Sequence, residues 1–241
     1  MAAVRESEGL WPAALRTRRA AGFIPVIPDF KPRSPKEGEL MRGRSAAAVA
    51  RELKTLGAPA LSVVTEAASF GGSLRLLEET AAAGLPVLRK DFIRRPEDLR
   101  QTREAGAAAV LLICALLEYP ALAELFAAAH ELGLAVLVEA HTATELAAAG
   151  RLGARLVGLN NRDIRGLERD DGTVAHTEAL AALVPPGALL VSESGIRTPA
   201  DARTATRAGA DAVLVGSALW QAPDMSALYD ALQRAEGTVP G

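Results

Sequence analysis

The sequence has few of the residues that build covalent or metal frameworks. Its 241 residues include one cysteine, Cys114, and three histidines. A single cysteine excludes an intramolecular disulfide framework, and Cys114 follows an apolar run, which favours a small core residue over a zinc ligand. No second histidine stands at metal-ligand spacing from His141. We therefore expect no metal site.

Aromatic residues, net charge and long apolar runs are also scarce. Phe, Trp and Tyr make up 4% of the chain, so the core must be built mainly from Ala, Leu and Val. The formal net charge is −2, which argues against a general basic field for nucleic acid or anionic membranes. No apolar run has membrane-spanning length, and the first residues lack an apolar signal core. These absences predict a cytoplasmic protein with no nucleic-acid or membrane partner.

The chain is rich instead in short apolar runs that alternate with helical patterns. Strand-like runs cover residues 24–30, 60–65, 86–90, 109–114, 134–139, 155–160, 188–193 and 211–216. Helical patterns cover residues 11–21, 45–56, 73–83, 96–105, 120–132, 143–151, 174–183, 198–208 and 217–235. Most of the runs are continuously apolar rather than alternating, which indicates strands buried on both faces of a helix-covered parallel sheet. Pro25 and Pro28 weaken only the first strand, because proline cannot donate to a ladder.

Eight strand–helix units predict a (β/α)8 TIM barrel, preceded by a short helical extension over residues 1–22. Glycine–alanine pairs beginning at Gly57, Gly106, Gly153 and Gly209 separate helices from strands, where glycine supplies a left-handed helix end. The rival fold is a doubly wound open sheet, but no G-x-G-x-x-G loop follows the first strand. No low-complexity linker interrupts the pattern, so we expect residues 1–241 to form one domain.

Polar residues stand where these apolar runs end. They are Asp29, Lys31, Lys90, Glu139, Asn160 with Arg162, and Glu193. The strand carboxyl ends of such a barrel converge on one face, so these residues should share one mouth. A lysine at the end of a buried strand usually faces an anion or transfers a proton, because burial disfavours its charge. The set therefore suits acid–base chemistry on an anionic substrate.

Two later turns have the character of a phosphate site. Ser194 and Gly195 follow the seventh strand, and Gly216 and Ser217 follow the eighth. Glycine lets backbone amides approach an anion closely, and the loops after strands seven and eight are the usual phosphate site of these barrels. The plainer alternative is that these glycines only make tight strand–helix turns.

Several longer motifs occur in a fixed order between about Phe23 and Leu219. Among them are Lys31-x-x-Ser34-Pro35-x-x-Gly38, Leu88-Arg89-Lys90-Asp91-Phe92, Val138-Glu139-Ala140-His141, Gly158-Leu159-Asn160-Asn161-Arg162 and Ser192-Glu193-Ser194-Gly195-Ile196. In these motifs the sequence resembles the indole-3-glycerol phosphate synthase family. The resemblance implies a barrel enzyme that needs no cofactor. It also implies a small phosphorylated substrate, 1-(2-carboxyphenylamino)-1-deoxyribulose 5-phosphate, which is cyclised, decarboxylated and dehydrated; we expect a monomer or weak homodimer.

The resemblance also implies a role for each matched residue. Lys90 would be the general acid at the substrate ketone, and Glu139 its partner in proton transfer during dehydration. Lys31 would hold the substrate carboxylate, with Ser34 nearby. Asn160 and Glu193 would bind the ribulose hydroxyls and orient the lysines. The remaining binding residues would be Phe92 against the anthranilate ring, and Ser194, Gly195, Gly216, Ser217 and Arg162 at the phosphate.

Two departures from the family pattern keep a second hypothesis open. Asp29 stands where the family usually has glutamate, and Ser69 where an aromatic residue commonly precedes Phe70. The alternative is a paralogous lyase or cyclase of specialised metabolism, acting on a related aryl-amino sugar phosphate. A third possibility is a barrel that binds a phosphorylated ligand without converting it. Asp91 could be catalytic, but a structural partner for a nearby basic group is the simpler interpretation.

Overall fold

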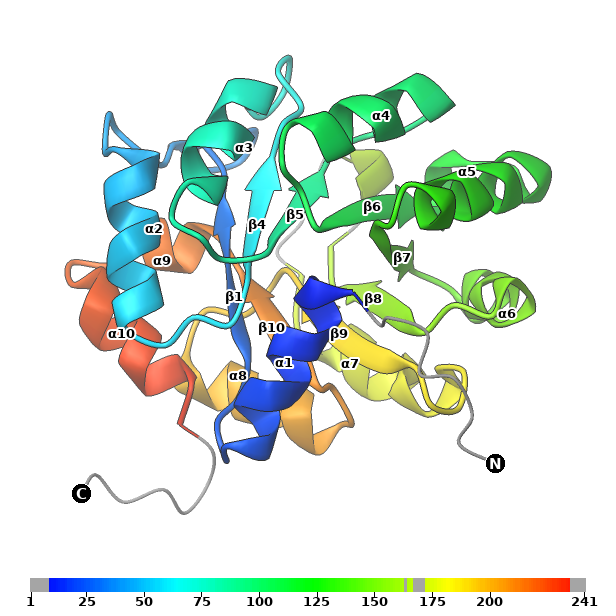
Figure 1. Cartoon of the computed structure of the whole chain (residues 1–241). Helices are drawn as coiled ribbons and strands as arrows, with labels where there is room; N and C mark the ends of the chain where they lie inside the picture. Colours follow the sequence, from blue (N-terminus) through cyan, green and yellow to red (C-terminus); the bar gives the residue numbers. More distant parts are fainter. Residues whose placement is uncertain (1–8, 163, 167–171, 235–241) are drawn as a thin grey trace.

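A computed structural model describes residues 9–162, 164–166 and 172–234. Eight parallel strands close into a barrel, and the last of them, β10, pairs with the first, β1. The barrel strands are β1 Val26–Phe30, β4 Leu61–Val64, β5 Val87–Lys90, β6 Ala109–Ile113, β7 Ala135–Ala140, β8 Leu156–Asn160, β9 Leu189–Glu193 and β10 Ala212–Val215. Helices surround this barrel (Figure 1), so the predicted (β/α)8 fold is confirmed.

The helices agree with the predicted ones apart from the last. They are α1 Leu10–Ala20, α2 Ala46–Thr55, α3 Leu74–Ala81, α4 Pro96–Glu104, α5 Tyr119–Glu131, α6 Ala143–Leu152, α7 Ala175–Leu180, α8 Pro199–Arg207, α9 Ser217–Gln221 and α10 Met225–Leu232, with 3-10 turns at Cys114–Leu116, Ile164–Gly166 and Ala181–Leu183. The predicted helix 217–235 is split at Pro223, and the Asp224 side chain then caps α10 by accepting the Ala227 amide at 2.9 Å. Within the described ranges, no helix is long and apolar enough to cross a membrane.

Two local features predicted from the sequence behave as glycine and proline chemistry requires. Gly57, Gly106, Gly153 and Gly209 all have positive φ, between 70° and 117°, so each ends its helix in the left-handed region. Strand β1 forms despite its prolines, because Pro25 precedes the strand and contributes only a carbonyl, which accepts the Val213 amide at 3.0 Å.

The barrel interior and the helix layer take alternate side chains of each strand. The interior cluster includes Ile27, Leu88, Leu137 and Val191, whereas neighbouring residues such as Val87 pack against the helices. Because side chains on a strand repeat every two residues, the residue two places after an interior one also faces inward. The inward positions above this apolar layer are therefore Asp29 and Lys31 after Ile27, Lys90 after Leu88, Glu139 after Leu137, and Glu193 after Val191.

Helix α1 closes the barrel at the end opposite these polar residues. Trp11 and Leu15 are 0% and 1% exposed and belong to the interior cluster. The Trp11 indole Nε1 donates to the Leu61 carbonyl at 3.0 Å, and Leu61 is the first residue of β4. The described part of the predicted extension is thus a plug over the amino ends of the strands (Figure 1).

A short antiparallel ribbon, β2 Arg33–Ser34 with β3 Gly38–Glu39, lies between β1 and α2 where the sequence predicts only a loop. Arg33 anchors it to the loop after β4, because its Nη2 donates to the Ala68 carbonyl at 2.6 Å and its amide to the Phe70 carbonyl at 3.1 Å. The ribbon therefore lies over the carboxyl ends of the strands, next to the predicted mouth.

Asp91 is the structural partner of Arg89, on the outer face of β5. The Arg89 side chain is 7% exposed, and its Nη2 lies 2.8 Å from Asp91 Oδ2. The same guanidinium donates to Thr65 Oγ1 at 2.9 Å and to Thr102 Oγ1 at 3.0 Å. This network joins β5 to α4 and to the loop after β4. The simpler interpretation of Asp91 is therefore confirmed.

Replacing Asp91 with alanine should destabilise the fold by roughly 3–5 kcal/mol, because it leaves the buried Arg89 charge without its carboxylate. The matched control is Glu97→Ala, since Glu97 and its partner Arg100 are 53% and 56% exposed and such pairs contribute about 0–1 kcal/mol. Urea unfolding followed by circular dichroism measures both. Equal losses in the two variants would contradict a structural role for the Arg89–Asp91 pair.

Candidate active site

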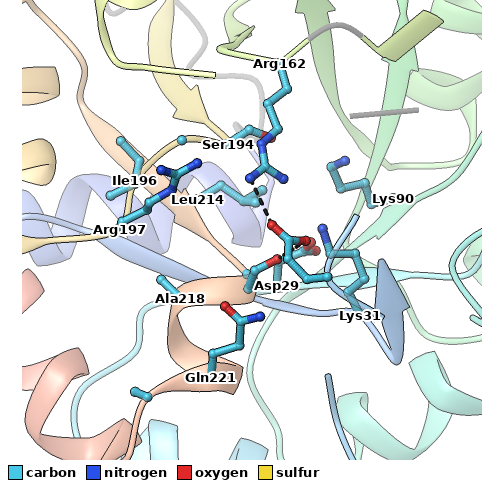
Figure 2. A pocket seen from close by; sticks show the side chains of 15 residues that line it. Asp29, Lys31, Lys90, Arg162, Ser194, Ile196, Arg197, Leu214, Ala218 and Gln221 are labelled. Carbon is cyan, nitrogen blue, oxygen red and sulfur yellow. Dashed lines mark hydrogen bonds and ion pairs between the residues drawn. The ribbon is translucent and has the colours of Figure 1, made fainter. Parts of the chain in front are cut away.

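A cavity of about 270 Å³ opens at the carboxyl ends of the barrel strands. Its lining combines residues from β1, the ribbon, β5 and the turns after β8, β9 and β10. The lining residues are Asp29, Lys31, Glu37, Lys90, Arg162, Ser194, Gly195, Ile196, Arg197, Leu214, Gly216, Ser217, Ala218, Gln221 and Ala222. Figure 2 shows Lys31 and Lys90 on one side of this cavity and Ile196 and Arg197 on the other.

The structure thus brings most of the predicted site residues together. Both lysines, Asp29, Arg162 and the four predicted phosphate residues line the cavity. Glu139, Asn160 and Glu193 lie deeper, at 1%, 0% and 0% exposure, at or near the carboxyl ends of β7, β8 and β9. Asn160 and Glu193 are direct partners in the β8–β9 register. These three polar residues form the floor of the mouth rather than its wall.

A second, much smaller cleft adjoins the first, and Lys31 and Lys90 border both. This cleft is lined mainly by apolar side chains, among them Phe70, Phe92 and Leu111, and its volume is about 10 Å³. The Phe70 and Phe92 rings meet edge to face at 6.5 Å between centroids, and Lys31 Nζ lies 5.7 Å from the Phe70 ring centre. The two lysines therefore stand between a polar cavity and an aromatic cleft.

Asp29 is fixed in the mouth from two directions. Its side chain is buried, and Oδ1 accepts the Ser62 hydroxyl at 2.7 Å. Its backbone carbonyl accepts the Trp220 indole Nε1, also at 2.7 Å. Gly216 keeps the other side open, because a Cβ there would lie 3.3 Å from Asp29 Oδ2. The carboxylate is therefore fixed by Ser62 on one side and faces the cavity on the other.

The turn after β9 has the backbone strain that often marks a binding site. Ser194 has φ 62°, rare for a residue other than glycine, and Gly195 has φ 71°. A Cβ on Gly195 would lie 2.9 Å from the Gly172 carbonyl oxygen, so only glycine fits without a shift. Asn161 supports the turn from below, with Nδ2 donating to the Ser194 carbonyl at 2.9 Å. This arrangement holds the turn in one conformation at the cavity wall.

Glu37 also lines the cavity, although no sequence motif pointed to it. Its carboxylate lies 3.0 Å from Arg162 Nη2 and accepts the Ser217 hydroxyl at 3.0 Å. Ser34, predicted near the substrate, does not line the cavity: its buried Oγ accepts the amides of Lys36 and Glu37 at 3.2 and 3.3 Å. No local pattern could reveal these contacts, since Glu37 lies 125 residues from Arg162 and 180 from Ser217.

Burial by itself raises the pKa of Glu37. Hydrogen bonds from Ser34, Arg162 and Ser217 and the positive charge of Arg162 oppose this effect, and together they hold the pKa below its ordinary value. Glu37 is therefore a carboxylate anion at neutral pH.

Neither metal ligation nor thiol chemistry finds support in the part of the chain that the structure describes. No group of three or more His, Cys, Asp or Glu residues there could hold a metal ion. Cys114 is buried; desolvation, with smaller contributions from the charges of Glu145 and Glu139, raises the pKa of its thiol to about 12. A thiol with such a pKa is a poor nucleophile at neutral pH. This environment agrees with the predicted core role of Cys114.

Comparison with known proteins gives one consistent family. A family model described as indole-3-glycerol phosphate synthase matches residues 3–232. An indole-3-glycerol phosphate synthase from Opitutus terrae is 43% identical over 88% of this chain and 80% of the relative. Synthases from Thermococcus kodakarensis and Pyrococcus furiosus are 44% and 43% identical, over 87% and 92% of this chain and 92% and 96% of theirs.

Solved structures with lower identity support the fold alone. A thiamine phosphate pyrophosphorylase from Pyrococcus furiosus superposes with a TM-score of 0.60 at 17% identity, over 87% of this chain and 93% of that one. A mandelate oxidase variant superposes with a TM-score of 0.62 at 22% identity, over 86% and 69%.

Gly158→Ala should destabilise the barrel and displace Glu193. A Cβ at position 158 would lie 1.9 Å from Glu193 Oε1, and Glu193 is 0% exposed. We expect a loss of roughly 1–3 kcal/mol, as for other overpacked cores, measured by urea unfolding. The control is Gly150→Ala at an exposed position of α6, where the new Cβ meets only Pro185 at 3.5 Å and stability should rise by about 0.5–1 kcal/mol. A Gly158→Ala variant as stable as the native chain would show that the Glu193 carboxylate does not lie against Gly158.

Proposed function

The chain belongs to the indole-3-glycerol phosphate synthase family, and on that premise we propose how its residues bind and convert the substrate. Its reaction is the ring closure, decarboxylation and dehydration of 1-(2-carboxyphenylamino)-1-deoxyribulose 5-phosphate to indole-3-glycerol phosphate in tryptophan biosynthesis. The substrate has a phosphate at one end, an aromatic acid at the other, and the reacting ketone between them. A site for it must therefore hold two unlike ends and place an acid at the centre.

One observation carries the residue assignment: Lys31 and Lys90 border both the polar cavity and the aromatic cleft. The phosphate binds in the polar cavity, at Ser194, Gly195, Gly216 and Ser217, with Arg162 supplying positive charge. The anthranilate ring enters the cleft beside Phe92 and Phe70. The cleft must widen to admit the ring, because only about 10 Å³ is free there. The ketone then lies near the two lysines.

Proton transfers complete the reaction. The ring carbon that bears the carboxylate attacks the ketone carbon, and the ketone oxygen takes its proton from the Lys90 ammonium group, which stabilises the developing negative charge. Loss of carbon dioxide returns the electron pair to the ring. The new hydroxyl then leaves as water while the neighbouring carbon loses a proton, and Glu139 shares in this transfer. Apart from the new carbon–carbon bond, which the substrate forms within itself, the steps move only protons, carbon dioxide and water, so acid–base side chains suffice.

The other polar residues orient these groups. Lys31 binds the substrate carboxylate until it is released, with Ser34 shaping the ribbon beside it. Asn160 and Glu193, on the floor of the mouth, bind the ribulose hydroxyls and fix the lysines. Asp29 helps to position Lys31, two residues further along the same strand face. The finer expectations, a cytoplasmic enzyme that is a monomer or weak homodimer, are tested by cell fractionation and light scattering.

Lys90→Ala should lower kcat by about 10²–10⁴-fold, the range for a lost general acid. Product is followed by indole fluorescence after addition of the carboxyphenylamino-deoxyribulose phosphate. Lys90→Arg separates charge from proton transfer, because guanidinium keeps the charge but does not release a proton; it should stay slow with a nearly normal KM. Near-native turnover in either variant, with unfolding curves unchanged, would remove Lys90 from the acid role.

Asp29→Glu should lower kcat/KM, although glutamate is the usual family residue at this position. The longer side chain cannot keep the Ser62 hydrogen bond without moving its carboxylate, and a misplacement near 1 Å can cost about 10²-fold. The Asp29→Glu, Ser62→Ala double variant is the control, because the second change removes the hydrogen bond that fixes Asp29. A rate increase in the Asp29→Glu single variant would show that Asp29 is a suboptimal substitute for glutamate.

A further inference from the structure

Glu37 places an internal anion among the residues to which we assign the phosphate. The side chain reaches the cavity from the turn between β2 and β3 and is 15% exposed. Its two carboxylate oxygens take separate partners: Oε1 lies 3.0 Å from Arg162 Nη2, and Oε2 accepts the Ser217 hydroxyl at 3.0 Å. Arg162 and Ser217 are two of the groups assigned to the substrate phosphate, so Glu37 and a bound phosphate would compete for the same donors.

Burial and local hydrogen bonds fix the contact between Glu37 and Arg162. Arg162 is 5% exposed, and the charge-assisted bond to Glu37 is the kind that is about twice as strong as a neutral one. Ser34 fixes the turn that carries Glu37, since its Oγ accepts the amides of residues 36 and 37. The ribbon is held in turn by the Leu40 amide, which donates to the Pro32 carbonyl at 2.8 Å. The backbone that carries Glu37 is therefore held within the ribbon, and its carboxylate is held by Arg162 and Ser217.

We propose that Glu37 is a specificity-determining residue, an internal carboxylate that occupies the phosphate cradle until a phosphate group displaces it. This inference rests on the phosphate assignment of the proposed function. A phosphate monoester carries about −1.5 to −2 charge and three strong acceptor oxygens at neutral pH, whereas the carboxylate carries one charge and two oxygens. Groups no stronger than a carboxylate therefore cannot displace Glu37, and the cradle selects phosphate over carboxylates.

Competition of this kind has a measurable consequence. If Glu37 fills the cradle in nine molecules of ten, the apparent dissociation constant of phosphate is about tenfold weaker than the intrinsic one. Without the Glu37 carboxylate, every anion that binds in the cradle should bind more tightly by that factor. Selectivity falls at the same time, because weak anions no longer face a competitor.

The experiment compares Glu37→Gln with the native enzyme, using inorganic phosphate and acetate as probes. Both are titrated by calorimetry and as inhibitors competitive with substrate. In Glu37→Gln we expect phosphate to bind about tenfold more tightly, acetate inhibition to become detectable, and KM to fall with kcat unchanged. Glu39→Gln is the matched control, since Glu39 is exposed on the same ribbon and does not line the cavity. It should behave as the native enzyme does.

Three results would overturn the inference. Unchanged or weaker phosphate binding in Glu37→Gln, with phosphate binding still lost in Ser217→Ala, would leave the phosphate site in place and remove Glu37 as a competitor. Equal gains in phosphate affinity in Glu37→Gln and Glu39→Gln would show that the effect comes only from removing one negative charge, wherever it lies on the ribbon. If phosphate bound neither the native enzyme nor Glu37→Gln, the phosphate assignment itself would fail, and the inference with it.

Discussion

In a closed parallel barrel, side chains along each strand alternate between the interior and the helix layer, and this alternation fixes the contents of the mouth. The apolar layer that includes Ile27, Leu88 and Leu137 fills the barrel interior. The next inward positions along the strands therefore lie at the strand ends. Those positions hold Asp29, Lys90 and Glu139. The chemistry of the site is thus a continuation of the packing below it, and a one-residue shift in register would move these charges into the helix layer.

The sequence predicted the features that depend on local patterns. Continuous apolar runs located the strands, glycine–alanine pairs located the helix ends, and the strand-end rule located Lys90 and Glu139. It did not predict the ribbon, whose two-residue strands are too short to show a period. Nor could it predict Glu37 in the cavity, because that position follows from contacts with residues far along the chain. In Leu88-Arg89-Lys90-Asp91, only the alternation of side chains along the strand shows that Arg89 and Asp91 pair outside the barrel while Lys90 lines the cavity.

One segment, from β1 to α2, contacts the loop after β4 and the turns after β8 and β10 around the mouth. Arg33 binds the loop after β4, and Glu37 binds the turns after β8 and β10. Arg44 completes the set: its Nη2 donates to the Trp220 carbonyl at 2.6 Å and its guanidinium lies over the Trp220 ring. Because the segment from β1 to α2 takes part in all these contacts, any movement that widens the polar cavity or the aromatic cleft would involve the same piece of backbone.

The plug at the amino end of the barrel also has a spectroscopic consequence. The chain has two tryptophans; Trp11 is sealed in the plug and Trp220 supports Asp29 at the mouth. The two indoles therefore sit at opposite ends of the barrel and emit from separate environments. With Trp220 replaced by phenylalanine, the remaining fluorescence would follow closure of the amino end alone, so assembly of the scaffold could be timed independently of the ordering of the mouth.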